Sequence, residues 1–332
     1  MTSVMPLWLL MTLVWIGVAQ GETRLTIGQG FASSHAAPLW VAVENGYFRK
    51  HGIEPDLRLI RGGATTTAAL LNGELKLAAV AMSQVVGPVT RGADLVVVAS
   101  LVDKMPYRLI VGPHVRSPED LEGKKVAVST PGAAAYVAAR LALKHLGLDL
   151  KRDRIGLVQI GTDPERLAAL LAGSVDAAIM LPSAASRLPM PSYRTLIDLR
   201  SANIPWLHTC LVTTRGFLRS HPGVVEGALR AVAEATAFVL DPRNAEGVKA
   251  TIAKYLRLDE PTVVEDSYRA AVEEVAWKPI PDLAGVATVL ETMAVLGIVE
   301  EAARLRPKDI VDQGIILKLD QEGLLDRLRP RK

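Results

Sequence analysis

The chain has 332 residues, of which 49% are hydrophobic and 22% are charged, and its formal net charge is +3. Single cores usually stop growing below this length, so these totals predict a globular chain with two domains. The slight charge gives no support for a nucleic-acid binder, which would carry a basic face. Cys210 is the one cysteine and the six histidines lack metalloenzyme spacing, so we expect no disulfide, no metal, no cofactor and no nucleic-acid partner.

Residues 1–21 have the pattern of a secretory signal peptide. An apolar run of 14 residues, PLWLLMTLVWIGVA, is followed by small residues and then by charged ones. A membrane-spanning helix needs about 20 apolar residues, whereas a signal peptide needs fewer. Cleavage near Ala19 or Gly21 would release a mature protein into the periplasm. The segment before the apolar run has no Lys or Arg, so uncleaved membrane anchoring is the alternative.

After this segment, strand-like and helix-like patterns alternate along the chain. Short β-rich runs are followed by amphipathic runs that end in glycine. The first series predicts strands at 25–30, 56–60, 77–81 and 94–101, with helices at 36–52, 62–73 and from Ser83. The second series predicts strands at 124–130, 154–160 and 175–180, with helices at 131–147, 163–173 and from Pro182. Two similarly wound α/β lobes account for this order.

One phrase of the sequence occurs twice. Residues 69–83 read ALLNGELKLAAVAMS and residues 169–183 read ALLAGSVDAAIMLPS, at an offset of 100 residues. Each copy lies at the same point of its β-α-β-α-β series and ends on a serine at a helix start. Chance likeness between Ala-Leu helices is the alternative, but the matching neighbours favour two related lobes.

From about Arg215 onward, long helical patterns replace the alternation. They cover 221–241, 245–257, 260–277 and 281–297, with Asp, Glu or Pro near their starts. Amphipathic helices need an apolar surface to cover, and the sheet of the first lobe offers one. We therefore expect a discontinuous first lobe, 24–110 plus 212–332, and a second lobe at 111–211.

Two lobes joined by crossing segments leave a cleft, and the strand ends place candidate ligand contacts in it. Ligands of open α/β sheets bind beyond the carboxyl ends of the strands, where helix N-termini present free N–H groups. Thr65 and Thr66 fit helix capping as well as ligand contact, and Asp163 fits an N-cap better. The candidates are Ser33, His35, Gly63, Thr65, Thr66, Ser83, Gln84, Thr130, Gly132, Ala133, Asp163, Pro182 and Ser183.

Several motifs together carry a family resemblance. They are Pro38, Glu44, Gly46-Tyr47-Phe48, Gly52, Gly63, Leu70 and Gly73-Glu74, with SPEDLEGKKVAVSTPG and GSVDAAIM further on. This set resembles the nitrate/taurine/sulfonate family of ABC-transporter substrate-binding proteins, close to the group that contains thiamine-pyrimidine precursor binders. Lys76 departs from the family's pattern, which has Asp there, whereas Asp176 keeps it in the second copy.

The resemblance implies a two-lobe periplasmic-binding-protein fold of type II, with the ligand cleft between the lobes. It implies a substrate-binding component of an ABC importer without catalytic residues, which captures a small organic solute and delivers it to permease and ATPase subunits. Sulfonates, carboxylates and pyrimidine-like compounds are the ligand classes left open. An enzyme of thiamine-pyrimidine or menaquinone synthesis is the alternative, although this chain lacks the cysteine-rich motif of the pyrimidine-forming relatives.

Overall fold

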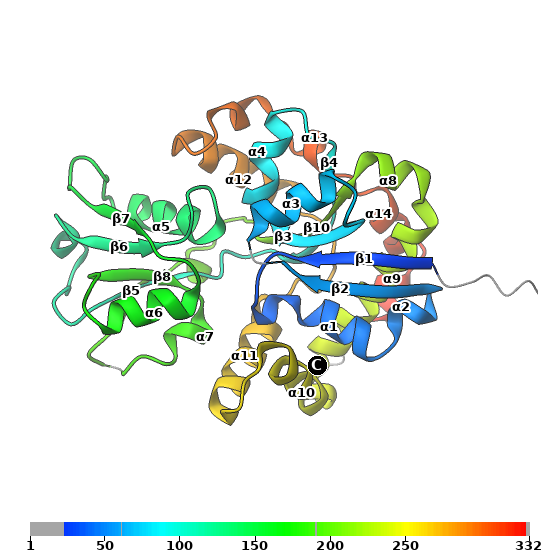
Figure 1. The fold of residues 1–332 in the computed structure, drawn as a ribbon, viewed down its shortest axis with the longest axis horizontal. Helices are drawn as coiled ribbons and strands as arrows, with labels where there is room; N and C mark the ends of the chain where they lie inside the picture. Colours follow the sequence, from blue (N-terminus) through cyan, green and yellow to red (C-terminus); the bar gives the residue numbers. More distant parts are fainter. Residues whose placement is uncertain (1–22, 61, 190, 330–332) are drawn as a thin grey trace, which may run out of the picture.

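Two five-stranded sheets form the centres of two lobes (Figure 1). The computed structural model describes residues 23–60, 62–189 and 191–329, and the predicted signal segment at 1–21 lies outside them. The first sheet has the order β2 (Ile53–Leu59), β1 (Thr23–Gln29), β3 (Leu77–Ala81), β10 (Thr209–Thr214) and β4 (Leu95–Val102). The second has the order β7 (Gly156–Gln159), β6 (Lys125–Val128), β8 (Ala177–Met180), β5 (Arg108–Val111) and β9 (Arg194–Asp198).

The two sheets share one topology. β1 pairs in parallel with β2 and β3, and β6 pairs in the same way with β7 and β8. β10 runs antiparallel between β3 and β4, and β5 runs antiparallel between β8 and β9. Three parallel strands therefore end at one edge of each sheet, where the next helices begin. The predicted α/β class with two lobes is confirmed.

Helices follow the parallel strands in both lobes. In lobe one they are α1 (Ala37–Glu44), α2 (Tyr47–Lys50), α3 (Gly63–Leu71) and α4 (Ser83–Thr90), and in lobe two α5 (Ala134–His145), α6 (Asp163–Leu171) and α7 (Pro182–Ala185). Short 3-10 helices are η1 (Ser34–Ala36), η2 (Pro118–Leu121), η3 (Leu199–Ala202), η4 (Pro242–Asn244) and η5 (Glu300–Arg304). The helix expected at 36–52 is divided, because Gly46 turns the chain with a φ of +70°.

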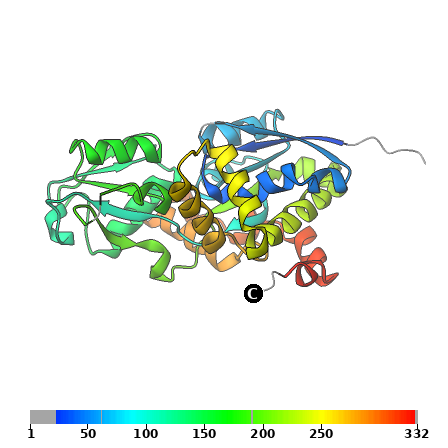
Figure 2. The same ribbon diagram turned by 90° about the horizontal axis from the view of Figure 1, so that it is seen from below.

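The C-terminal helices pack on lobe one. They are α8 (Arg215–Ser220), α9 (Pro222–Leu240), α10 (Ala245–Leu256), α11 (Pro261–Glu274), α12 (Leu283–Val295), α13 (Pro307–Ile310), α14 (Gly314–Gln321) and α15 (Leu324–Arg327). α9 packs against α1, α2 and β2, and α14 packs against α9 and β4. α11 and α12 lie on opposite sides of the junction between the lobes (Figures 1 and 2). Within the described ranges, no helix combines the length and the apolar character needed to cross a membrane.

The chain crosses between the sheets twice, at 103–107 and at 199–208. β4 and β10 belong to the first sheet, whereas β5 and β9 belong to the second. The lobe boundaries expected after residues 110 and 211 therefore cut through β5 and β10. Because ladder hydrogen bonds hold a strand as one unit, the boundaries move back to the two crossings.

The repeated phrase occupies equivalent units in the two lobes. The first copy runs from α3 through β3 to α4, and the second runs from α6 through β8 to α7. Gly73 and Gly173 follow their helices with φ values of +80° and +67°. Glycine adopts this left-handed conformation without strain, so the shared Leu-Leu-x-Gly ending is a helix C-terminus in both lobes. The repeat therefore marks one structural unit used twice.

Candidate functional site

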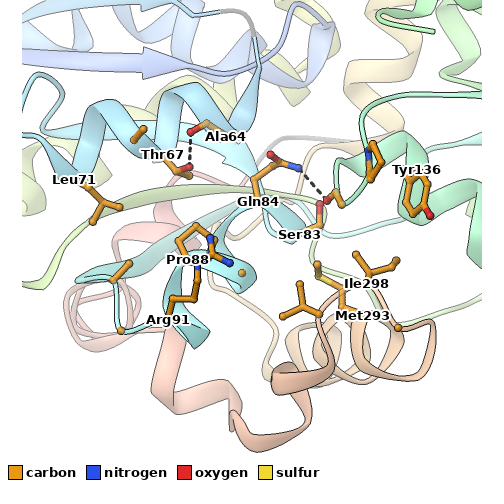
Figure 3. Close-up of a pocket in the computed structure, with 18 residues that line it drawn as sticks. Ala64, Thr67, Leu71, Ser83, Gln84, Pro88, Arg91, Tyr136, Met293 and Ile298 are labelled. Atoms are coloured by element: carbon orange, nitrogen blue, oxygen red, sulfur yellow. Dashed lines mark hydrogen bonds between the residues drawn. The ribbon is translucent and has the colours of Figure 1, made fainter. Parts of the chain in front are cut away.

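A pocket of about 650 Å³ lies between the two lobes (Figure 3). One wall comes from α3 and α4 of lobe one, and another comes from the start of α5 in lobe two. The third wall is the end of α12 with the turn that follows it. The volume falls within the range of about 300–1,000 Å³ that small-molecule sites occupy. We call this cavity the interlobe pocket.

Ser83 and Gln84, both predicted from the sequence, line the interlobe pocket at the start of α4. Ser83 is 7% exposed, and its Oγ atom has no hydrogen-bond partner among the described residues. The Gln84 Nε2 atom donates a hydrogen bond of 3.0 Å to the carbonyl oxygen of Gly132 in lobe two (Figure 3). An unpaired buried hydroxyl costs about 1–3 kcal/mol. The Ser83 hydroxyl is therefore a group that a polar ligand would satisfy.

Two predicted glycines position this bridge between the lobes. A Cβ atom on Gly63 would lie 2.5 Å from the Gln84 Cγ atom, so a larger residue there would displace the Gln84 side chain. Gly132 has a φ of +79°, in the region that favours glycine. Gly63 is therefore required by the close approach of Gln84, and Gly132 by its backbone conformation.

One positive charge and no negative charge face the interlobe pocket. Arg91 is the one charged side chain among the described lining residues. Its guanidinium lies over Gly87 of α4, with the Nη1 atom 3.4 Å from the place of a Cβ atom there. Tyr136 of α5 adds a phenol whose oxygen accepts a hydrogen bond of 3.4 Å from Arg140. The pocket thus combines a cation and hydroxyl groups with apolar walls.

Ten of the thirteen predicted contacts lie outside the lining of the interlobe pocket, among them Gly63, Thr65, Thr66, Thr130 and Ala133. Thr66 is 0% exposed, and its hydroxyl donates a hydrogen bond of 2.9 Å to the Gly62 carbonyl oxygen, so it serves the start of α3. Thr65 is exposed on the same helix. Thr130 is exposed, and its carbonyl oxygen accepts the N–H of Ala133, which is the N-cap of α5. Neither Thr65 nor Thr66 caps α3, because its N-cap is Gly62 and no side chain accepts a capping hydrogen bond there.

Asp163 is neither the N-cap of its helix nor part of the pocket lining. Thr162 has the extended N-cap conformation, and Asp163 is the first residue of α6. The Asp163 carboxylate pairs with Arg166, a residue that is 3% exposed. The guanidinium also donates to the carbonyl oxygens of Ile160, Gly161 and Ile179. Asp163 thus keeps a buried arginine paired at the ends of β7 and β8, a role that the Asp-Pro-Glu pattern did not reveal.

Ser33 and His35 are buried near the crossings and do not line the interlobe pocket. The His35 Nε2 atom lies 2.6 Å from the Glu274 Oε2 atom of α11. The His208 ring meets the rings of His35 and Tyr107 edge-on, each at 5.5 Å between centroids. Burial, and then the proximity of His35, holds the pKa of His208 well below its usual range. Because Tyr107 and His208 belong to the two crossings, these rings pack the hinge between the lobes.

Pro182 and Ser183 begin α7 on the other side of the junction. Pro182 lines a smaller cavity of about 190 Å³ between lobe two and α11. Beside it, Arg200 of η3 forms an ion pair with Glu273 of α11. Ser183 is half-buried and lines neither cavity. The lobes are therefore bridged by side chains on two sides of the cleft.

Pocket residues that lie away from strand ends were not predicted from the sequence. Arg91 is at the far end of α4, Tyr136 is within α5, and Met293 and Ile298 flank the end of α12. A helix end at Gly297 is visible in the sequence, where Gly297 has a φ of +61°. Which helix end faces the cleft depends on tertiary packing, and no local pattern contains that information.

Cys210 lies within β10 and is fully buried. Its Sγ atom is 3.5 Å from the Val80 carbonyl oxygen, to which the thiol donates. Burial raises the pKa of the Cys210 thiol. Nucleophilic cysteines act as exposed thiolates of lowered pKa, so this cysteine has the properties of a structural residue.

The fold and the position of the pocket define a class of protein. Two lobes of like topology, two crossing segments and a cavity between the lobes make a two-lobe periplasmic-binding-protein fold. The family described as NMT1/THI5 like matches residues 33–245, which is more than half of the chain. The chain belongs to this family, and the resemblance found in the sequence is confirmed at that level.

Solved structures share the fold at low sequence identity. The alkanesulfonate-binding protein of Xanthomonas axonopodis pv. citri, bound to MOPS, has a TM-score of 0.71 at 20% identity over 89% of this chain and 100% of that chain. The periplasmic aliphatic sulphonate binding protein of Escherichia coli has a TM-score of 0.69 at 20% identity, over 93% and 92%. The periplasmic nitrate-binding protein of Synechocystis PCC 6803 has a TM-score of 0.74 at 15% identity, over 93% and 91%.

A curated relative matches in sequence over part of its length. A Brucella abortus protein named as a binding protein is 29% identical over 139 residues. The match spans 42% of this chain and 41% of that protein. These relatives are named for binding, which agrees with a substrate-binding role for this chain.

Proposed function

We propose that this protein is the substrate-binding component of an ABC importer and that it captures a small organic anion between its lobes. The observation that carries the proposal is the interlobe pocket, which takes Ser83 and Gln84 from one lobe and Gly132 and Tyr136 from the other. A solute that contacts both lobes stabilises the closed arrangement, because those contacts exist only when the lobes are together. A membrane permease can then recognise that arrangement.

The chemistry of the lining supports an organic anion. Arg91 offers a charge-assisted hydrogen bond to an anionic group, and no described lining residue carries a competing negative charge. The hydroxyl groups of Ser83 and Tyr136 are further polar groups of the lining. The volume far exceeds what nitrate fills, and Met293 and Ile298 provide apolar surface for a carbon skeleton. A sulfonate or carboxylate with an apolar body is therefore the proposed ligand, ahead of a pyrimidine or nitrate.

The names of related proteins and the predicted signal peptide support a cellular compartment for this protein. The sulfonate-binding protein of E. coli and the nitrate-binding protein of Synechocystis are named as periplasmic. Residues 1–21 have the signal-peptide pattern that would send this chain to the same compartment. We propose that the mature protein works in the periplasm and delivers its ligand to permease and ATPase subunits.

Calorimetric titration tests the proposed ligand class. The mature protein is titrated with alkanesulfonates, aromatic carboxylates, a neutral pyrimidine and nitrate. We expect saturable binding of at least one organic anion and weaker or no binding of the neutral compound and nitrate. Arg91→Gln should weaken that binding about tenfold, as expected when a charge-assisted hydrogen bond is lost.

The matched control is Arg219→Gln, which removes the same charge from an exposed position on α8. We expect this variant to bind as the wild type does. If no organic anion binds, or if Arg91→Gln binds as tightly as the wild type, the proposed ligand class is wrong.

A further inference from the structure

The third wall of the interlobe pocket is the rigid C-terminus of α12. The N–H groups of Ile298 and Val299 both donate to the Met293 carbonyl oxygen, at 2.9 Å and 3.1 Å. Gly297 supplies the left-handed turn that reverses the chain there. Such a helix end satisfies its own carbonyl groups and holds the residues after it in fixed places. Met293 itself is 1% exposed, so this wall of the pocket is anchored by a buried side chain.

A residue of lobe two holds this wall against the pocket. The Arg140 Nη2 atom donates a hydrogen bond of 2.8 Å to the Leu296 carbonyl oxygen at the end of α12. A cation at a helix C-terminus is favourable because it meets the negative end of the helix dipole. The same guanidinium donates to the Tyr136 hydroxyl group, which lines the pocket. The wall is therefore attached to lobe two although its chain comes from the C-terminal helices.

The two side chains of the wall each face a glycine, one from each lobe. The Ile298 Cγ2 atom lies 3.8 Å from the place of a Cβ atom on Gly132 in lobe two. The Val299 Cγ2 atom lies 3.7 Å from the place of a Cβ atom on Gly87 in lobe one. Since the glycines contribute no side chain, the sizes of Ile298 and Val299 fix the width of the pocket at these points.

Ile298 and Arg91 lie toward different ends of the pocket. The Arg91 guanidinium is over Gly87, whereas Ile298 is beside Gly132, the residue that Gln84 reaches. Along α4 the rise of the helix separates Ser83 from Gly87 by about 6 Å. A ligand whose anionic group meets Arg91 would extend its apolar end toward Ile298.

We propose that Ile298 is a specificity-determining residue that limits the length of the apolar part of the ligand. This inference rests on the proposed function, because it takes an organic anion oriented by Arg91 as the occupant. The size of Ile298 would select the length of the carbon chain, while Arg91 would bind the anionic group. Ile298 and Arg91 both lie away from the carboxyl ends of strands, where ligand contacts are usually inferred from a sequence.

The test measures the dissociation constants of the linear alkanesulfonates from methane- to octanesulfonate for the wild type and Ile298→Ala. In the wild type, affinity should rise about fourfold for each methylene until the chain reaches Ile298, and then fall. Ile298→Ala should move the preferred chain about two methylenes longer, because the removed side chain leaves room of that order. The milder variant Ile298→Val should lengthen the preferred chain by less. This variant replaces Ile298→Ala in the test if the alanine variant folds poorly.

Val295→Ala is the matched control. Val295 is on the same helix end, is 60% exposed and does not line the pocket, so its truncation should leave the preferred chain unchanged. An unchanged preference in both Ile298 variants, or an equal shift in Val295→Ala, overturns the role of Ile298 while the proposed function stands. If the wild type binds no alkanesulfonate, the role of Ile298 is overturned, and the titration with aromatic carboxylates decides separately whether the organic-anion proposal stands.

Discussion

Replacing Ala64 by tryptophan is expected to abolish ligand binding while the protein stays folded. Ala64 is exposed on the first turn of α3 and lines the interlobe pocket. An indole at this position would occupy the space between the α3 wall and Gln84, so the lobes could not close around a ligand. Surface substitutions of this kind usually change stability by no more than about 0.5 kcal/mol. We expect affinity for the tightest organic anion to fall at least about 100-fold, which is about 2.7 kcal/mol.

Thr65→Trp provides the neighbouring control. Thr65 is also exposed on α3 but does not line the pocket. Calorimetric titration and a melting curve are measured for both variants. Loss of binding in Ala64→Trp alone places the ligand in the interlobe pocket. Equal losses in both variants, or none in either, would mean that the ligand binds elsewhere in the cleft.

Arg200→Glu is expected to hold the lobes apart. Arg200 pairs with Glu273, and its Nη1 atom lies 3.8 Å from the fully buried Glu274 Oε1 atom. A glutamate at position 200 would place a carboxylate beside the carboxylates of Glu273, Glu274 and Asp198. Two unit charges at 4 Å interact by about 4 kcal/mol at an effective dielectric constant of 20. Partial exposure and salt reduce this to about 1–2 kcal/mol, so affinity should fall about 5- to 30-fold.

Small-angle scattering provides a readout that does not require a ligand. The radius of gyration of Arg200→Glu should exceed that of the wild type, and the difference should shrink in high salt as the repulsion is screened. Adding Glu273→Arg should restore much of the affinity and the compact shape. A variant that is as compact as the wild type and binds as tightly would show that this ion pair does not hold the lobes together.

The fold was predictable wherever the sequence pattern is local. β3 begins and ends where its apolar run LAAVA predicts, and α9, α10, α11 and α12 lie within three residues of their expected bounds. The patterns missed β5, which runs antiparallel between β8 and β9, and they missed β9, a half-buried edge strand. Such strands are specified by the partners they pair with, and those partners are distant in the sequence.

The candidate site was predictable in part, for a related reason. Ser83, Gln84 and Gly132 line the interlobe pocket because strand ends and glycine turns define them locally. Thr66 and Asp163 sit at similar strand ends but are used by the fold, through the Gly62 carbonyl group and the Arg166 guanidinium. A sequence motif shows that a hydroxyl or a carboxylate stands at a helix start. Whether the group faces a cavity depends on neighbours that other elements bring.

The family motif gives a further example of a structural residue. Asp176, kept in the second copy of the repeat, accepts a hydrogen bond of 2.8 Å from the Lys125 N–H at the start of β6. In the first copy, the Lys76 Nζ atom instead donates to the Gly73 carbonyl oxygen at 3.0 Å. Both residues lie in the turn between a helix and the next strand and neither lines the interlobe pocket, so the departure at Lys76 leaves the pocket lining unaffected.

A crystal structure of the mature protein with the tightest organic anion tests the central claim most directly. We expect density for one ligand in the interlobe pocket, with its anionic group at Arg91 and contacts to Ser83 of one lobe and Tyr136 of the other. We also expect the Gln84–Gly132 hydrogen bond to be kept in the bound state. Density in the cleft beside Pro182 and Arg200, or contacts to one lobe only, would contradict the account.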